Sequence, residues 1–384
     1  MINVKPAKCV LLVLRVTFFS LLITVCQIST GNAQAAVSSP IAIPPNGYAY
    51  YGVQLSWDVD TPAAYASRLG KTPVVYGDFV AFPLNTTDKL AMSQEVDQIA
   101  AVHGKLMLTL EPMGGLNAVT SAAIRDLVTV LANDNARGVD IFVRFAQEMN
   151  GSWYPWGQQP TAYVSAFRNV AKAVHQGAPK SAMVWAPNYG GGYPFSGGAY
   201  NPKPGTPNFQ TLDTNHDGVL TMDDDPYGPY YPGDAFVDWV GFTDYHWGNS
   251  WPWGANVLPE AGKFVADLTG TYNGLIGDER AVPDFYATYA VGHNKPFVLT
   301  ETSALYNPNR TDGASNYDIK MSWANQVFAA NLTTQFPRLK MVLWFEYYKV
   351  ETETGNIIDW RVTYDPTILA GYKSVLPNWL IFSQ

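Results

Sequence analysis

The chain has 384 residues with 24 basic and 32 acidic side chains, and its formal net charge is −8. An acidic chain without a basic cluster is a poor partner for nucleic acid or an anionic lipid surface, and it would repel a polyanionic substrate. Aromatic residues make up 14% of the chain and include 12 tryptophans. This excess needs a use beyond filling a core, so the composition favours a neutral partner.

Residues 1–35 have the layout of a secretory signal peptide. A basic start without acids precedes a long apolar stretch and an A-x-A pattern that ends at Ala35, so we expect cleavage there and a secreted protein. An uncleaved membrane anchor is the alternative, because the apolar stretch is long for a signal, although Arg15 interrupts it. Both cysteines, Cys9 and Cys26, lie in this leader. We therefore expect no disulfide in the folded domain and no membrane contact after cleavage.

Beyond the leader, short apolar stretches alternate with helical patterns. The expected strands span residues 49–57, 73–82, 105–110, 140–146, 182–187, 237–245, 296–301 and 340–346. The expected helices span residues 88–103, 118–137, 160–177, 280–291, 315–334 and 365–379. Eight strands alternating with helices predict an α/β protein, a single (β/α)8 TIM barrel over residues 36–384. An open doubly wound sheet is the rival, but no glycine-rich phosphate-binding turn follows an early strand.

The connection between strands five and six is an exception to this alternation, because residues 187–238 contain no convincing helix. Within this insert, residues 213–224 read "DTNHDGVLTMDD", which fits a twelve-residue calcium loop of the EF-hand type. The expected metal ligands are Asp213, Asn215, Asp217, the carbonyl of Val219, and Asp224. The helices that flank an EF-hand are not evident, so we expect a structural calcium ion and not a switch. An acidic loop without metal is the alternative.

Two glutamates end apolar strands at positions that a barrel would bring together. Glu148 follows strand four in "VRFAQEMNGSWYPWGQ", and Glu301 closes strand seven in "PFVLTE". The carboxyl ends of barrel strands meet at one mouth, where catalysis takes place. Two carboxylates there can hydrolyse a glycoside, one as acid/base and one as nucleophile. Glu111 and Glu346 also lie at strand ends, and a glutamate at such a position can instead cap a helix or form an ion pair.

Aromatic side chains gather at the same strand ends. Trp153 and Trp156 follow strand four, Tyr245 and Trp247 follow strand six, and Trp344 lies in strand eight. The electron-rich face of an aromatic ring packs well against the polarised C–H groups of a sugar. We therefore expect these residues to bind carbohydrate, with packing in the core as the alternative for some of them.

The motifs "RFAQEMNGSWYPWG", "MVWAPN", "VDWVGFTDYHWG", "KPFVLTETS" and "VLWFE", in this order, resemble glycoside hydrolase family 26 over nearly the whole chain after the leader. The family consists of retaining (β/α)8 glycosidases, mostly endo-β-mannanases. The resemblance implies that Glu148 is the acid/base and Glu301 the nucleophile. It further implies that Tyr245 hydrogen-bonds the nucleophile, that Trp344 forms the floor of the subsite for the scissile sugar, and that Trp156 lies beside the acid/base.

One position departs from the family, which usually has histidine immediately before the acid/base. This chain has Gln147 there, which can donate to a substrate hydroxyl or to the nucleophile but cannot titrate, so it bears on sugar preference. Arg144 lies three residues before this glutamine. On the strand alternation its side chain points into the barrel, where it could hold carboxylates from below.

The sequence therefore predicts a secreted, monomeric, retaining endo-glycosidase that acts on a neutral β-linked polysaccharide, of the β-1,4-mannan type or a mixed-linkage β-glucan. It needs no cofactor for catalysis. A non-catalytic carbohydrate-binding barrel is the alternative that Gln147 suggests. A calcium-dependent structural or adhesive protein is a third, which the lack of internal repeats disfavours.

Overall fold

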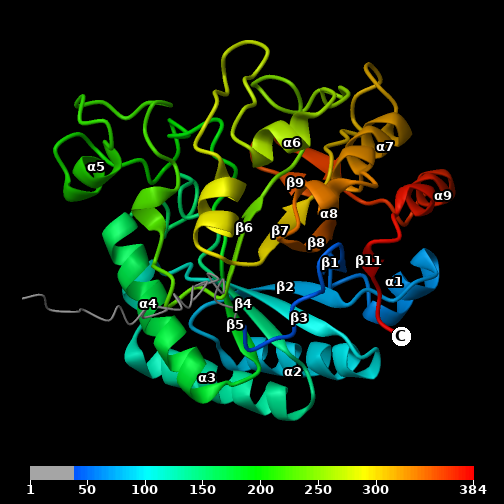
Figure 1. Ribbon diagram of the computed structural model, residues 1–384, viewed down its shortest axis with the longest axis horizontal. Helices are drawn as coiled ribbons and strands as arrows, with labels where there is room; N and C mark the ends of the chain where they lie inside the picture. The colour runs from blue at the N-terminus through cyan, green and yellow to red at the C-terminus, as the bar shows by residue number, and fades with distance from the viewer. Residues whose placement is uncertain (1–38) are drawn as a thin grey trace, which may run out of the picture. The chain divides into compact units, whose positions relative to one another are not determined.

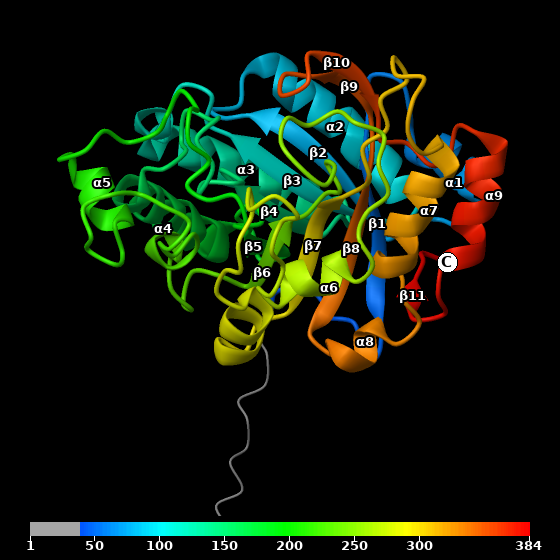
Figure 2. The same ribbon diagram turned by 90° about the horizontal axis from the view of Figure 1, so that it is seen from above.

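The computed structural model describes residues 39–384; the signal peptide predicted at residues 1–35 lies outside the described residues. Within residues 39–384, parallel strands form a closed ring (Figures 1 and 2). The ring strands are β1 (Ala49–Leu55), β2 (Val75–Ala81), β3 (Lys105–Glu111), β4 (Ile141–Phe145), β5 (Ser181–Trp185), β6 (Trp239–Thr243), β7 (Phe297–Thr302) and β8 (Leu339–Glu346). Each strand pairs with the next, and β8 pairs with β1 over six residues, which closes the barrel.

Helices lie between the strands and cover the outside of the ring (Figure 1). They are α1 (Pro62–Leu69), α2 (Thr86–Ala101), α3 (Ser121–Ala136), α4 (Pro160–Gly177), α5 (Pro207–Leu212), α6 (Lys263–Leu268), the π-helical η3 (Tyr286–Gly292), α7 (Asn316–Val327), α8 (Leu332–Gln335) and α9 (Pro366–Val375), with the short 3-10 turns η1 (Leu116–Ala118) and η2 (Gly228–Tyr230). Several begin at a side chain that accepts a hydrogen bond from a backbone N–H of the first turn, as Asn85 does for α2 and Asp365 for α9. Such caps satisfy donors that the helix itself leaves free.

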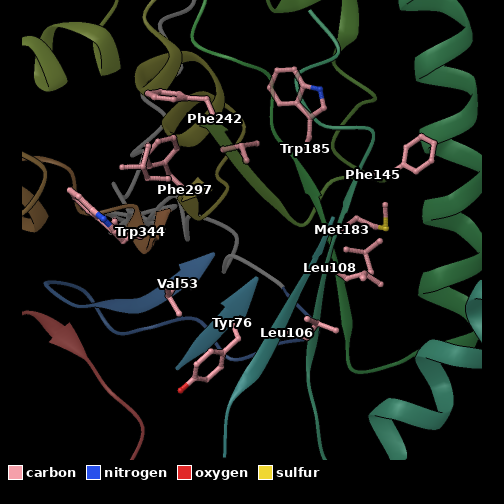
Figure 3. Packing of buried hydrophobic residues seen from close by; sticks show 14 of the residues in the cluster. Val53, Tyr76, Leu106, Leu108, Phe145, Met183, Trp185, Phe242, Phe297 and Trp344 are labelled. Atoms are coloured by element: carbon pink, nitrogen blue, oxygen red, sulfur yellow. The ribbon is translucent and has the colours of Figure 1, made fainter. Parts of the chain in front are cut away.

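Strand alternation divides the core in two. On β3, for example, Leu106 and Leu108 face the helices, and Met107 between them faces the inside of the ring. Figure 3 shows side chains of the outer cluster, which fills the space between strands and helices and includes Trp344 on β8. The inner cluster fills the ring and is made of Ile41, Val74, Val75, Met107, Phe142, Ala182, Val184, Ala186, Trp239, Val298, Met341 and Leu343. The barrel interior is therefore a packed core, and the chemistry of such a barrel takes place at its mouth.

The predicted fold class is confirmed, and all eight predicted strands are present. The sequence reasoning missed several short elements. These are α1, α5, α6, the hairpin of β9 (Tyr348–Glu351) and β10 (Asn356–Asp359), and β11 (Leu380–Ile381), which pairs with β1 outside the ring. Elements of this length owe most of their stability to tertiary packing, so they leave a weak local pattern. In the part of the chain that the structure describes, no helix has the length and apolar character needed to cross a bilayer.

Candidate active site

The local backbone turns both candidate glutamates toward the mouth. Glu148 comes three residues after β4, and its backbone N–H donates to the carbonyl of Ala186 at 3.1 Å. Glu148 and Ala146 both have a positive φ, 54° and 49°, a conformation that costs a non-glycine residue about 1–3 kcal/mol and that is common at active sites. Glu301 lies on β7, where the register against β6 shifts next to Thr243. Such irregularities re-aim side chains at barrel rims.

Two donors, one on β4 and one just after β6, hold the Glu301 carboxylate. The Arg144 guanidinium, buried at 0% exposure on β4, donates through Nη1 to Oε1 of Glu301. The Tyr245 hydroxyl donates to Oε2 at 2.7 Å, which is the contact that the family resemblance implies. Glu301 itself is only 6% exposed. These two donors fix the orientation of the carboxylate, so the arrangement suits a nucleophile.

The environment of Glu148 favours the protonated form of its carboxyl group. Burial, and after it the negative charge of Glu301, raises the pKa of Glu148 to about 7. Its Oε2 accepts a hydrogen bond from the indole Nε1 of Trp153 at 3.0 Å. The Thr243 hydroxyl hydrogen-bonds Glu148 and accepts from Nη2 of Arg144 at 2.7 Å. The two acids are thus joined through Thr243 and Arg144, and only a protonated Glu148 could give its proton to a leaving group.

The two other strand-end glutamates have different surroundings. Glu346 is 2% exposed and accepts hydrogen bonds from the backbone N–H groups of Val362 at 3.1 Å and Thr363 at 2.9 Å. It therefore serves as a structural acceptor. Glu111 is half-buried, and its Oε1 accepts from Nε2 of Gln147 at 2.7 Å. Glu111 ends β3, so it lies at the same end of the barrel, where the charges of Glu301 and Arg144 act on it. The sequence reasoning left Glu111 out of the site.

Among the predicted sugar-binding aromatics, Trp153, Tyr245 and Trp247 are half-buried at the mouth. Trp153 packs edge-on against Phe195, with ring centroids 5.0 Å apart, and Trp247 packs in the same way on Trp360 at 5.0 Å. Each keeps part of its surface accessible while its orientation is fixed by a neighbouring ring. Such rings suit sugar stacking because little conformational freedom is lost on binding.

Trp156 is placed differently from the prediction. It is buried at 0% exposure, stacks on Tyr154 with a centroid distance of 4.4 Å, and donates through Nε1 to the carbonyl of Gln147 at 2.7 Å. The assignment of Trp156 as a substrate contact is therefore wrong. Its indole supports the turn that carries Gln147 and Glu148 from beneath.

The assignment of Trp344 as a subsite floor is also wrong. Trp344 is fully buried in the outer cluster (Figure 3). Its ring centroid lies 6.1 Å from that of Phe328 and 5.0 Å from that of Tyr372. Its neighbour Phe345 lies on the opposite face of the strand and contacts Tyr245 with ring centroids 5.5 Å apart. Side chains alternate along a strand, so an error of one residue exchanges the mouth for the outer core. Phe345 and Trp360 are the aromatic residues that support the mouth here.

Substitution of Trp344 by phenylalanine tests this correction. We expect the free energy of unfolding to fall by about 1–3 kcal/mol, because part of a packed side chain is lost, while the KM for polysaccharide stays within about twofold. Trp247→Phe is the matched control, and it should raise KM with little change in melting temperature. Urea unfolding and steady-state kinetics measure the two effects. A raised KM for Trp344→Phe at unchanged stability would contradict the placement.

The predicted calcium loop is irregular and follows α5 directly. Both carboxylate oxygens of Asp213 accept backbone N–H bonds, from Asp217 at 3.1 Å and Gly218 at 3.0 Å, and Asp224 accepts from the N–H of Thr214 at 2.7 Å. Asn215 donates to Asp217 at 3.2 Å. Across residues 39–384, no group of three His, Cys, Asp or Glu side chains is arranged to hold a metal ion. The calcium site stays a prediction from the spacing of the loop.

Solved structures of other proteins are similar to this chain in fold. The modular endo-β-1,4-mannanase of Cellulomonas fimi, a family 26 mannanase, matches with a TM-score of 0.55 at 16% identity, over 88% of this chain and 72% of that chain. This chain shares the fold of that mannanase. The GH26C structure from a Muricauda species matches with a TM-score of 0.55 at 13% identity, over 88% and 87% of the two chains. The catalytic domain of a family 26 endo-β-1,4-mannanase from Bacillus sp. JAMB-750 matches with a TM-score of 0.51 at 15% identity, over 87% of each chain.

At the level of sequence, Endoglucanase H of Acetivibrio thermocellus is 25% identical to this chain over 281 residues. The matched region is 71% of this chain and 24% of that protein, so the chain corresponds to about a quarter of a much longer relative. No family model matches the chain.

Proposed function

We propose that this protein is a secreted, monomeric, retaining endo-glycosidase that hydrolyses a neutral β-linked polysaccharide, either a β-1,4-mannan or a mixed-linkage β-glucan. The observation that carries the proposal is the joined pair of Glu148 and Glu301, one with a pKa raised to about 7 and the other held by Arg144 and Tyr245. The family 26 fold and the names of the similar proteins, endo-β-mannanases and an endoglucanase, support it.

The reaction follows from the protonation states of the two acids. Protonated Glu148 gives its proton to the glycosidic oxygen as the bond to the anomeric carbon breaks. The Glu301 carboxylate attacks that carbon and forms a glycosyl ester, with inversion. Glu148, now ionised, takes a proton from water, and the water oxygen attacks the same carbon. Glu301 leaves as a carboxylate and Glu148 is again protonated, so the configuration is retained overall and no cofactor takes part.

The charges around the mouth favour an uncharged glycan. Glu111, Glu148 and Glu301 lie there together, and the Arg144 guanidinium is already bound to Glu301. A uronic acid residue would bring another carboxylate into a site whose buried guanidinium is already paired, at a cost in both repulsion and desolvation. A neutral sugar hydroxyl meets no such barrier.

The test is to incubate the purified protein with mannan, mixed-linkage β-glucan, xylan and fungal wall glucan and to identify the released oligosaccharides. Oligosaccharides of several lengths from mannan or mixed-linkage glucan are expected from endo cleavage. Binding to one of these glycans without any product would favour the non-catalytic barrel. Neither binding nor product on any of the four would overturn the proposal.

A structural calcium ion at residues 213–224 is a separate proposal, which rests on the oxygen-bearing side chains at positions 1, 3, 5 and 12 of the loop. Calcium at about 100 times its Kd should stabilise the fold by about 2.7 kcal/mol. Thermal unfolding in millimolar calcium and in EDTA measures this, and Asp213→Asn should abolish the difference. Equal melting temperatures in calcium and EDTA would show that the loop holds no stabilising ion.

A further inference from the structure

Glu111 is a carboxylate at the mouth that has no part in the two-glutamate mechanism. It ends β3, is half-buried, and the charges of Glu301, Arg144 and Lys349 act on it. Burial raises its pKa above the ordinary value, and the hydrogen bond from Gln147 and the two cations oppose that rise. The site therefore retains an acid that is costly to bury, and such groups are usually kept for binding or chemistry.

The two cations near Glu111 are already paired elsewhere. Arg144 donates to Glu301 and to Thr243, and Lys349 forms an ion pair with Glu351 at 3.1 Å. One oxygen of Glu111, Oε1, accepts from Gln147. Among residues 39–384, no donor is placed on its second oxygen, Oε2. A half-buried carboxylate oxygen without a protein donor is a ready acceptor for a ligand hydroxyl.

Gln147 holds this carboxylate in a fixed orientation. Its side chain is 1% exposed, and its Nε2 donates to Glu111 at 2.7 Å. Its backbone carbonyl accepts the Trp156 indole N–H at 2.7 Å, and the residues on either side both have a positive φ. The main chain is held on both sides, and burial of the residue leaves the amide few alternative rotamers, so it stays against Glu111.

We propose that Glu111 is a substrate-binding residue, whose free carboxylate oxygen accepts a hydrogen bond from a hydroxyl of a neutral pyranose beside the scissile bond, and that Gln147 positions it. This inference rests on the proposed glycosidase function. It gives a specific role to the glutamine that replaces the family histidine. An amide keeps the same donor at every pH, so the orientation of Glu111 does not depend on the titration of its partner.

The experiment compares wild type with Glu111→Gln, Gln147→Met and the double variant. Glu111→Gln keeps the shape and removes the charged acceptor, and Gln147→Met keeps the volume and removes the donor. Hydrolysis of mannan and mixed-linkage β-glucan is followed by steady-state kinetics, and binding of a mannose and a mixed-linkage glucose hexasaccharide by calorimetry. Asp126→Asn, which removes one exposed charge that pairs with Lys89 on the outer helices, is the control, and melting temperatures are measured for all variants.

We expect Glu111→Gln to raise KM and Kd by about 10- to 100-fold, the range for a hydrogen bond to a charged group, with a smaller change in kcat and an unchanged melting temperature. Gln147→Met should weaken binding less, and the double variant should be no weaker than Glu111→Gln alone, since the glutamine acts through the glutamate. Unchanged KM and Kd in Glu111→Gln would overturn the proposal. If the losses of binding free energy in the two single variants add up in the double variant, Gln147 does not act through Glu111.

The calorimetric measurement of Kd separates the proposed role of Glu111 from the proposed glycosidase function. If wild type binds a hexasaccharide but releases no product, the glycosidase proposal fails, and the Kd ratio of Glu111→Gln to wild type still decides the role of Glu111. If wild type neither binds nor hydrolyses, both proposals fail.

Discussion

Replacing Glu301 with glutamine should lower the kcat for polysaccharide by at least about 10⁴-fold, the scale expected when an enzyme loses its covalent nucleophile. An amide cannot form the glycosyl ester, so turnover stops at the first bond-breaking step. Binding should persist, because Glu301 is 6% exposed and contributes little surface to a ligand. The measurements are reducing-sugar release for activity and calorimetry for the affinity of a non-cleaved oligosaccharide.

Glutamine is a better test than alanine because of Arg144. The guanidinium is fully buried and donates to Glu301, so alanine would leave a buried cation without its acceptor, a change that costs about 3–5 kcal/mol. Glu301→Gln keeps an oxygen that can accept from Arg144. The melting temperature of this variant should therefore be closer to the wild-type value than that of Glu301→Ala.

Glu346→Gln is the matched control for Glu301→Gln, because Glu346 also ends a strand but binds the backbone of Val362 and Thr363. It should lower stability and leave the kcat of the folded enzyme nearly unchanged. Activity in Glu301→Gln close to that of wild type would remove Glu301 from the nucleophile role.

Replacing Glu148 with alanine should lower kcat/KM for polysaccharide by about 10²–10⁴-fold, the usual contribution of a positioned general acid. For aryl glycosides with activated leaving groups, the rate of the first step should fall much less, because such groups leave without protonation. Azide should restore turnover, since a small anion can occupy the vacated space and attack the glycosyl ester without a general base. Equal losses on both substrate types, with no azide rescue, would contradict the acid/base role.

The pH dependence of kcat/KM tests the same acid/base role of Glu148. The acid must be protonated to act, and burial together with the charge of Glu301 raises the pKa of Glu148 to about 7. Wild-type kcat/KM for polysaccharide should therefore hold up to about pH 7 and fall about tenfold per pH unit above it. In Glu148→Ala this alkaline limb should vanish. A profile that falls near pH 4.5, the ordinary value for a glutamate, would show that the carboxyl is not perturbed in the working enzyme.

Much of the fold could be predicted because a buried parallel strand leaves a strong signal, a short apolar stretch between turn residues. That Glu148 and Glu301 lie together could be predicted as well, because the carboxyl ends of such strands meet at one place. The direction of a side chain into the barrel was predicted for Arg144 but not for every residue. All eight residues of β8 are buried, so hydrophobicity along the strand does not reveal which of Trp344 and Phe345 faces the mouth.

The error at Trp156 has a different cause. The chain leaves β4 through residues with positive φ at Ala146 and Glu148, and neither residue type announces that conformation in the sequence. Without the turn, the side-chain directions of the following aromatics cannot be derived. The sequence shows that Glu111 is an acid at a strand end. Its place in the site depends on the hydrogen bond from Gln147, 36 residues away in the chain, which the sequence does not reveal.

The most direct measurement is covalent trapping of the enzyme. A 2-deoxy-2-fluoro glycoside of the preferred sugar, with an activated leaving group, should be attacked normally but released slowly, because the fluorine destabilises the electron-poor transition state of both steps. Peptide mass spectrometry should then find the sugar on Glu301, and Glu301→Gln should remain unlabelled. A label on Glu111 or Glu148, or rapid turnover with no trapped ester, would contradict the assignment of Glu301 as the nucleophile and Glu148 as the acid.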